Sequence, residues 1–240
     1  MTIRGVNRAV EVPTDLGIDL GEAIARRRAA QVKTEASREA LALPAVPLAL
    51  PMRSDVAPSW PWVGDAALAL VNAAIGDRLA ARDNGLDLGM GFRVGDRYVD
   101  PQSAEALRGV GPQLALFVHG PATTEWCWTL EAERYHGAAR TSFGTLLERD
   151  LGFAPVFLRY NTGRHVSENG RALASATRAL VDACEGVRKI VLVGHSMGGL
   201  VVRSACHYAS EEGHAWVERV THVFCLGTPH GGAPLEKVGN

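Results

Sequence analysis

The stretch Lys189-Ile190-Val191-Leu192-Val193-Gly194-His195-Ser196-Met197-Gly198 decides the fold. Its first half is apolar and rich in β-branched residues, which is typical of a buried strand. From Gly199 to Ser210 the apolar residues recur at spacings that can share one helix face; they are Leu200, Val201, Ala205 and Tyr208. The sequence therefore predicts a strand, a tight turn and a helix, in that order.

The turn carries the pattern Gly-x-Ser-x-Gly from Gly194 to Gly198, which between a strand and a helix is typical of a nucleophile elbow. So tight a reversal forces strained backbone angles on Ser196, and glycine is needed two positions to either side because a side chain would collide with the turn. The hydroxyl is then raised at the carboxyl edge of a sheet, where a helix N-terminus favours developing negative charge. We favour this interpretation over an ordinary structural turn.

The composition excludes several classes of protein. The chain has 240 residues, 47% of them hydrophobic, which suffices for one large core or a core with a small attachment. Because the formal net charge is -1, the chain carries no electrostatic signature of nucleic-acid binding. No stretch approaches the roughly 18 uninterrupted apolar residues of a membrane-spanning helix, and the N-terminus has no secretory signal pattern. We expect a cytoplasmic protein.

Residues 1–110 are predicted to form an N-terminal, mainly helical attachment without catalytic motifs. Residues 21–43 are rich in helix-forming side chains, and residues 44–61 form a proline-rich connector. A second helix is predicted to begin at Gly64-Asp65, with Asp65 as its N-cap, and to end at Asn84-Gly85. Its core face is predicted to carry Leu68, Val71, Ile75 and Leu79. A hairpin over Phe92–Val99, turning at Gly95-Asp96, completes the attachment.

Residues 111–240 alternate between strands and helices. Four buried strands are predicted, with helical crossovers between them: Leu114–Val118, Pro155–Tyr160, Lys189–Val193 and Val220–Leu226. Crossover helices are predicted over Ser142–Leu151, Ser167–Cys184 and Gly199–Ser210. In the second helix Ser167 is the expected N-cap, the end lies at about Cys184, and the inward residues are Leu173, Leu180, Val181 and Cys184. This pattern predicts an α/β fold with a doubly wound, mostly parallel sheet.

Three motifs together resemble the α/β-hydrolase superfamily, nearest its lipase/esterase and GPI-inositol-deacylase-like branch. They are His119-Gly120 after a strand, the elbow Gly194–Gly199, and the run Leu226-Gly227-Thr228-Pro229-His230-Gly231-Gly232. The resemblance covers about residue 113 to the end. It implies hydrolysis of a carboxylic ester through a covalent acyl-serine at Ser196. Independently of the resemblance, we expect no cofactor and no metal, because the sequence has no H-E-x-x-H motif, no paired cysteines and no clustered carboxylates. It further implies oxyanion donors from the Met197 backbone N–H and from the His119-Gly120 loop.

The sequence departs from the pattern of this superfamily at two places. Pro121, directly after Gly120, has no N–H to offer as the second donor, so that Ala122 would have to substitute. The superfamily places an Asp or Glu and then a His after the serine, yet no Asp follows Ser196 in this chain. The simplest interpretation is that the acid and base belong to a segment beyond Asn240. We therefore expect slow ester hydrolysis by the 240-residue form itself.

Four histidines are candidates for supporting roles. His230 follows a strand on the edge where Ser196 emerges, and His165 lies in a loop after a strand, so both could line the pocket. For His230 we favour a loop-shaping role, for His165 an ordinary surface position, and for His195 packing. His119 is expected to anchor the oxyanion loop rather than to transfer protons.

Two other functions remain open. The missing acid and base and Pro121 are compatible with a non-catalytic interaction or regulatory protein on a hydrolase scaffold. The same serine would also serve an acyltransferase or a thioesterase, because the acyl-serine step is shared. As partners we expect a small-molecule or lipid ester, no nucleic acid and no transmembrane segment, with self-association through the N-terminal helices.

Overall fold

The computed structural model describes residues 62–99, 110–138, 141–184 and 186–232. They form one six-stranded sheet in the order β2-β1-β4-β3-β5-β6. Four strands are parallel to one another: β3 (Gln113–Val118), β4 (Ala154–Tyr160), β5 (Lys189–His195) and β6 (Val220–Leu226). In contrast, β1 (Met90–Val94) is antiparallel to both of its neighbours, β2 (Arg97–Val99) and β4. The predicted mostly parallel sheet is confirmed.

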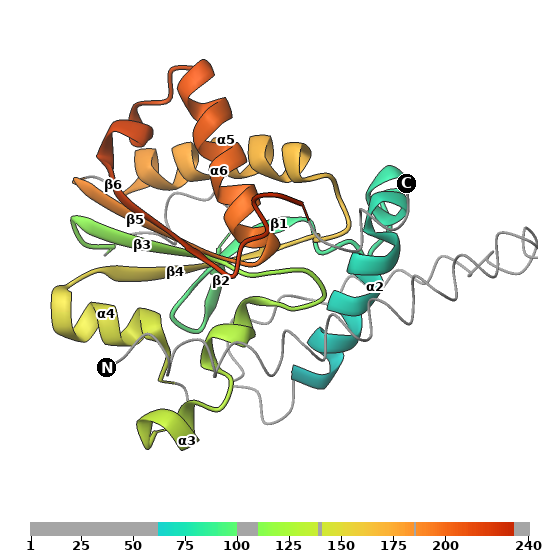
Figure 1. Ribbon diagram of the computed structural model, residues 1–240, viewed down its shortest axis with the longest axis horizontal. Helices are drawn as coiled ribbons and strands as arrows, with labels where there is room; N and C mark the ends of the chain where they lie inside the picture. The colour runs from blue at the N-terminus through green and yellow to red at the C-terminus, as the bar shows by residue number, and fades with distance from the viewer. Residues whose placement is uncertain (1–61, 100–109, 139–140, 185, 233–240) are drawn as a thin grey trace, which may run out of the picture.

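Helices cover both faces of the sheet, as a doubly wound fold requires (Figure 1). On one face lie α5 (Val166–Ala183) and α6 (Met197–Glu211), and on the other lies α4 (Phe143–Leu151). Two short 3-10 helices, η3 (Glu125–Thr129) and η4 (Ala215–Arg219), and the single turn α3 (Ala132–His136) complete the connections. The α/β-hydrolase type of fold expected from the sequence is confirmed.

Alternate residues of the central strands enter two separate cores. Leu116, Leu158 and Leu192 belong to the larger core with α5 and α6, while Phe117, Phe157 and Val193 belong to the smaller one with η3 and α4. The period of two follows from the pleat of the strands. Leu173, Leu180, Val181 and Cys184, the predicted inward residues of α5, are all buried. The strands around the elbow are therefore held from both sides.

Helix ends differ by a few residues from the sequence prediction. The helix α2 runs over Trp62–Ala81, so Asp65 lies in its first turn rather than at its N-cap, and the helix ends before Asn84. Its fully buried positions are Ala69, Asn72, Gly76 and Leu79, so the buried face is rotated from the predicted one and shares only Leu79 with it. Hydrogen bonding and close approach decide this face, because Asn72 Nδ2 donates to the carbonyl of Leu86 at 2.8 Å and Gly76 leaves no room for a Cβ.

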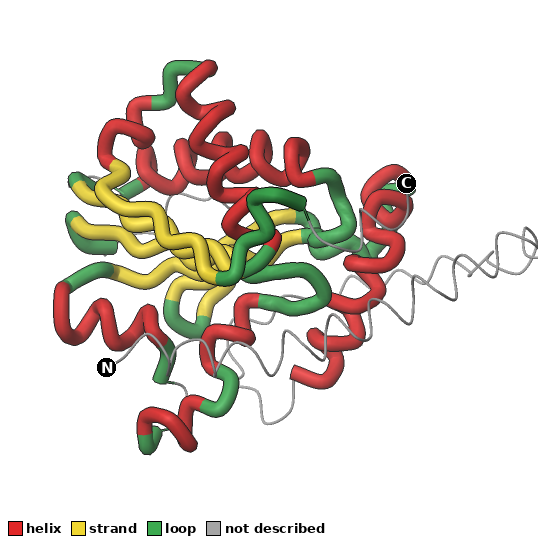
Figure 2. Tube along the Cα trace, in the orientation of Figure 1, coloured by secondary structure: helices red, strands yellow, loops and turns green. Residues whose placement is uncertain are grey.

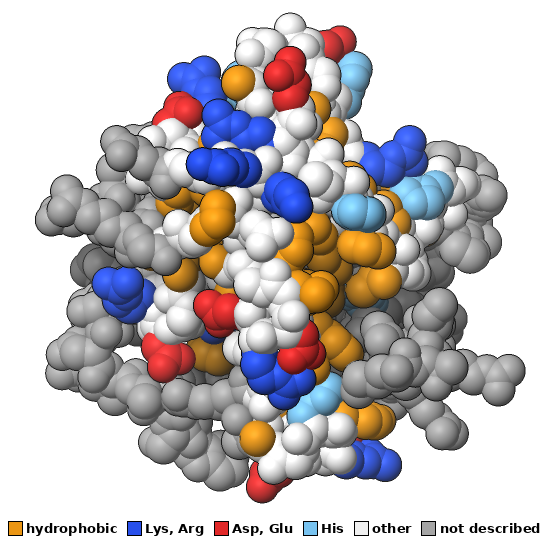
Figure 3. All heavy atoms as spheres, turned by 90° about the vertical axis from the view of Figure 1, so that its left-hand side faces the viewer, with side chains coloured by type: hydrophobic (Ala, Val, Ile, Leu, Met, Phe, Trp, Pro, Cys, Tyr) orange, Lys and Arg blue, Asp and Glu red, His pale blue; other side chains and the backbone are white. Residues whose placement is uncertain are grey.

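Two further expectations about α5 and β6 are wrong. His165, not Ser167, is the N-cap of α5. The strand β6 is not buried: it lies at the edge of the described sheet, and Val223 and Phe224 are 42% and 49% exposed. Figure 3 shows the side of the molecule at which the parallel strands begin, and hydrophobic side chains gather in the middle of this face among charged ones. Apolar composition predicted a strand here, but could not say that one edge is open.

The hairpin around Gly95-Asp96 is confirmed, and it is part of the main sheet, because β1 is hydrogen-bonded to β4. The division of the chain between residues 110 and 111 remains a prediction, although the sheet runs across it. The expected helix over 21–43 and the connector over 44–61 lie outside the described residues. No helix in the described ranges is long and apolar enough to cross a lipid bilayer.

Candidate active site

Ser196 occupies the turn between β5 and α6 with backbone angles of φ 52° and ψ −126°. An L-residue rarely adopts a positive φ, so the surroundings must enforce it. The Ser196 N–H donates to the carbonyl of Leu226 on β6 at 2.8 Å, and its own carbonyl accepts from Gly199 N–H at 3.1 Å. The side chain is half-buried at the first turn of α6. The strained turn expected from the sequence is present.

The glycines of the motif leave no room for a side chain. A Cβ on Gly194 would lie 2.5 Å from the Cα of Gly199, and one on Gly198 would lie 2.3 Å from the carbonyl oxygen of Val118. The helix therefore begins in direct backbone contact with the end of β3. Met197 is the first residue of α6, where backbone N–H groups lack a partner within the helix. Its N–H is thus available to an oxygen placed at the turn.

The loop after β3 lies against the elbow, as the sequence predicts. A Cβ on Gly120 would come 3.0 Å from the Cβ of Ser196 and 3.4 Å from the backbone oxygen of His195. Pro121 is exposed, and Ala122 has a left-handed φ of 57°. The Ala122 N–H is directed to Thr162 Oγ1 at 3.4 Å, on the β4 side of β3, whereas Ser196 lies on the β5 side. In this arrangement the Ala122 N–H does not face the serine.

His119 anchors this loop from below. The fully buried ring donates from Nδ1 to the carbonyl of Gly120 at 2.8 Å, and Tyr160 Oη donates to the carbonyl of His119 itself at 2.8 Å. Because a carbonyl oxygen only accepts, Nδ1 carries the proton of the neutral ring. Burial lowers the pKa of His119 to about 4, so the ring is neutral at pH 7. These contacts support the predicted anchoring role.

His195, directly before the serine, is buried against Trp128, with the ring centroids 6.4 Å apart and nearly perpendicular. Burial also lowers its pKa to about 4. Trp128 in turn packs edge-on against Phe117, with a centroid distance of 5.1 Å. Both the histidine and the tryptophan are thus part of the core, in line with the packing role that we expected.

The other two candidate histidines, His230 and His165, make no contact with Ser196 among the contacts of the described residues. His230 is exposed, and its Nδ1 accepts a hydrogen bond from Arg203 Nη1 at 2.8 Å, on the second turn of α6. His165 is exposed at the start of α5. Two histidine–carboxylate pairs follow Ser196, His207 with Glu211 and His214 with Glu212. They lie near the far end of α6, about 15 to 20 Å along the helix from the serine.

The structure also contains a buried ion cluster next to the loop after β3, which the sequence did not predict. The carboxylate of Glu125 accepts from Arg159 Nε and Nη2 at 2.9 and 2.8 Å and from Tyr98 Oη at 2.5 Å. Arg159 Nη2 also donates to Asp65 of α2 at 2.5 Å. Burial alone would raise the pKa of Glu125, but hydrogen bonds from Arg159 and its charge lower it below the usual value. This cluster joins α2, β2, β4 and η3.

A signal for this cluster exists in the sequence. Arg93 and Arg159 interrupt otherwise apolar strands, and a charge inside a buried strand requires a partner. The partner could not be identified, because Glu125 is 34 residues from Arg159 in the chain and the pairing depends on tertiary structure.

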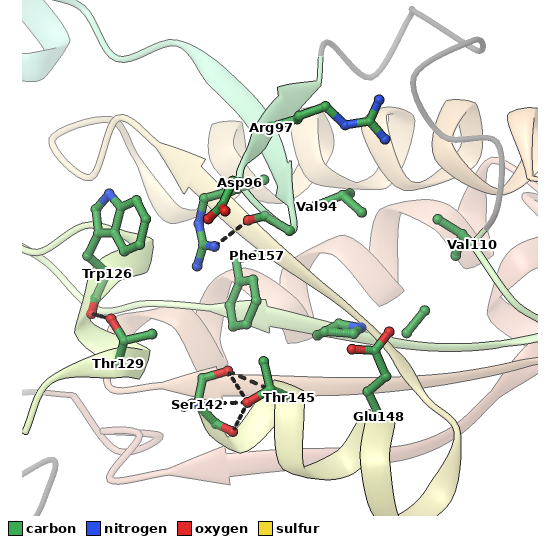
Figure 4. Close-up of a pocket in the computed structure, with 14 residues that line it drawn as sticks. Val94, Asp96, Arg97, Val110, Trp126, Thr129, Ser142, Thr145, Glu148 and Phe157 are labelled. Atoms are coloured by element: carbon green, nitrogen blue, oxygen red, sulfur yellow. Dashed lines mark hydrogen bonds between the residues drawn. The ribbon is translucent and has the colours of Figure 1, made fainter. Parts of the chain in front are cut away.

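The cavity in Figure 4 is separate from the serine. It has a volume of about 650 Å³ and lies on the α4 face, between the β1–β2 hairpin and α4. Phe157 and Trp126 flank the guanidinium of Arg93, which lies 4.4 and 4.3 Å from the two ring centroids. Ser142 and Thr145 at its border bond to each other as a helix cap. Within the described ranges no three His, Cys, Asp or Glu side chains cluster as metal ligands would.

The sheet and the strained serine turn define an α/β-hydrolase type of protein. Residues 115–239, slightly more than half of the chain, match the family described as "PGAP1-like alpha/beta domain", and the chain belongs to this family. It is a hydrolase-type family, in agreement with the resemblance found in the motifs.

Two solved structures are similar to part of the chain. They are the Bacillus licheniformis lipase BlEst2 in its propeptide form, at 28% identity, and in its mature form, at 27%, each with a TM-score of 0.39. Each covers 55% of this chain, and the match spans 25% of the propeptide form and 46% of the mature form. The chain thus spans less than half the length of either lipase. No curated protein matches.

Proposed function

We propose that the protein is a serine ester hydrolase in which Ser196 is the nucleophile. The observation that supports this most directly is the backbone of Ser196 at φ 52°, between a buried strand and the first turn of α6. Attack of Oγ on an ester carbonyl would form an acyl-serine and release the alcohol, and water would then release the acid. The oxyanion formed on attack would accept from the Met197 N–H.

The neighbouring groups fit this reaction in two ways. Both His119 and His195 remain neutral at pH 7, so the ground state holds no imidazolium against the serine. Gly120 lies so close to Ser196 that the loop after β3 forms one wall of the reaction site. The substrate is an ester whose acyl and alcohol groups are unspecified.

The test is covalent labelling with a fluorophosphonate probe followed by peptide mapping. We expect the probe on Ser196, and no labelling in Ser196→Ala. Ser210→Ala is the matched control, because Ser210 is an exposed serine on the same helix whose hydroxyl bonds only to the Cys206 carbonyl. A folded full-length protein that stays unlabelled would overturn the proposal and favour the non-catalytic alternative. Product analysis with an added alcohol acceptor separates hydrolysis from acyl transfer.

A further inference from the structure

The loop after β4 is fastened to α2 by a buried carboxamide. Asn161 Nδ2 donates to the carbonyl of Gly76 at 2.9 Å and to Asp87 Oδ1 at 2.7 Å, while its Oδ1 accepts from Gly163 N–H at 2.9 Å. The residue is fully buried, and both amide hydrogens are used. A buried polar group satisfied in this way specifies one arrangement of the segments it joins.

The helix is distorted where Asn161 contacts it. Ile75 has φ −141° and ψ 19°, outside the helical range, so α2 is kinked one residue before Gly76. A Cβ on Gly76 would lie 1.9 Å from Asn161 Oδ1, and one on Gly163 would lie 2.0 Å from the carbonyl oxygen of Asn72. The two segments therefore meet backbone to backbone, which only glycine permits.

The same loop holds the segment that contacts Ser196. Thr162, the residue after Asn161, accepts a hydrogen bond through its hydroxyl from Ala122 N–H at 3.4 Å. Gly120, two residues before Ala122 in the loop after β3, lies against Ser196. Figure 2 shows these loops on the side of the sheet that faces α2. Continuous contacts thus run from α2 through the loop after β4 to the loop after β3.

We propose that α2 positions the candidate oxyanion loop through Asn161 and Thr162, and so belongs to the active site rather than to a separate attachment. Gly76, Asn161 and Thr162 are positioning residues: none of them is placed to touch substrate. The inference rests on the proposed function for its catalytic meaning. The mechanical part, the hold on residues 119–124, can be measured without any reaction.

The first experiment compares two glycine substitutions in one helix. Gly76→Ala places a methyl group against Asn161, whereas Gly64→Ala is a matched control with no atom within 4 Å. We expect Gly76→Ala to raise the rate of amide hydrogen exchange over residues 119–124 at least about tenfold, which corresponds to about 1.4 kcal/mol of local opening. Gly64→Ala should leave these amides as in the wild type.

A second variant keeps the test valid if Gly76→Ala does not fold. Thr162→Val removes only the hydroxyl acceptor, and Thr162→Ser restores it. We expect Thr162→Val to speed exchange at Ala122 about tenfold and to slow fluorophosphonate labelling of Ser196 about tenfold at a temperature where all variants are folded, with Thr162→Ser returning both rates close to the wild-type values.

The outcomes are separable. Unchanged exchange over residues 119–124 in Thr162→Val overturns the inference, and so does faster exchange with an unchanged labelling rate. A folded full-length protein that is never labelled overturns the proposed function, and the exchange rates alone then decide whether α2 holds the loop in place.

Discussion

Two turns end neighbouring parallel strands at the same edge of the sheet, yet they are built differently. The turn after β5 is closed: Gly194 and Gly198 touch backbone, and Ser196 is held at a positive φ. The turn after β6 is open: Cβ atoms on Gly227 or Gly231 would meet nothing within 4 Å, and His230 is exposed. The closed turn fixes the backbone of Ser196, whereas the exposed side chain of His230 in the open turn bonds to Arg203. The surrounding residues thus constrain the serine turn far more tightly than the histidine turn.

The largest difference between the two turns is expected when one methyl group is added to each of them. Gly198→Ala places a Cβ 2.3 and 2.5 Å from the carbonyl oxygens of Val118 and His119, which cannot move without breaking β3 from α6. We expect a loss of about 5 kcal/mol or more in the free energy of unfolding, or no folding. Gly231→Ala, in open space, should change it by less than about 0.5 kcal/mol. Urea unfolding measures both, and equal effects would abolish the distinction between the turns.

The next largest loss of stability is expected from the buried ion cluster of Glu125 and Arg159, which lies next to the loop after β3. Arg159→Met leaves the buried carboxylate of Glu125 without its main partner, and breaking a buried pair in this way costs about 3–5 kcal/mol. Asp150→Asn breaks the pair with Arg149, which is exposed and screened by solvent, and should leave the unfolding midpoint close to the wild-type value. Thermal and urea unfolding provide the measurement. A small loss in Arg159→Met would mean that the cluster contributes no more than a surface pair.

Acid should lower the free energy of unfolding because His119 and His195, next to the closed turn, are buried as neutral rings. The pKa values of His119 and His195 are lowered to about 4, below the ordinary value of 6.5, so the unfolded state binds more protons between these limits. Stability should therefore be complete above about pH 6.5 and fall progressively towards pH 4, by about 3 kcal/mol for each ring. Unfolding at a series of pH values tests this, and His195→Gln should make the dependence shallower. A flat profile over this range would contradict the prediction.

A small effect on folding is expected at the exposed edge strand β6. Phe224→Thr removes a side chain that is 49% exposed, so the free energy of unfolding should change by less than about 1 kcal/mol. The matched core variant Phe117→Ala, at 1% exposure, should cost about 3–5 kcal/mol. Light scattering at increasing concentration should show less self-association for Phe224→Thr than for the wild type, because exposed edges pair with other chains. An unchanged scattering profile would show that this edge is inert.

The sequence predicted the strands, the elbow and the hairpin well, because each carries a local signal. Apolar runs identified β3 to β6, and the spacing of Gly194 and Gly198 around Ser196 identified the turn. Local signals could not reveal the exposure of β6, which depends on what lies beside it. Nor could they predict the contact of Asn161 with Gly76, because the two residues are 85 positions apart and the contact is a hydrogen bond, which leaves no apolar pattern in the sequence. The rotated face of α2 has the same cause.

The integration of the hairpin into the sheet has a practical consequence for any shortened version of this chain. A protein that starts at residue 111 would lose β1, which pairs with Phe157 and Leu158. It would also lose the aromatic ring of Tyr98 on β2 and the carboxylate of Asp65 on α2, which both contact Arg159. A guanidinium and a bare row of amides would then face water where a neighbour had been. A chain cut at the border that its motifs suggest would therefore expose an unpaired strand edge, which is prone to pair with other chains, rather than yield an independent domain.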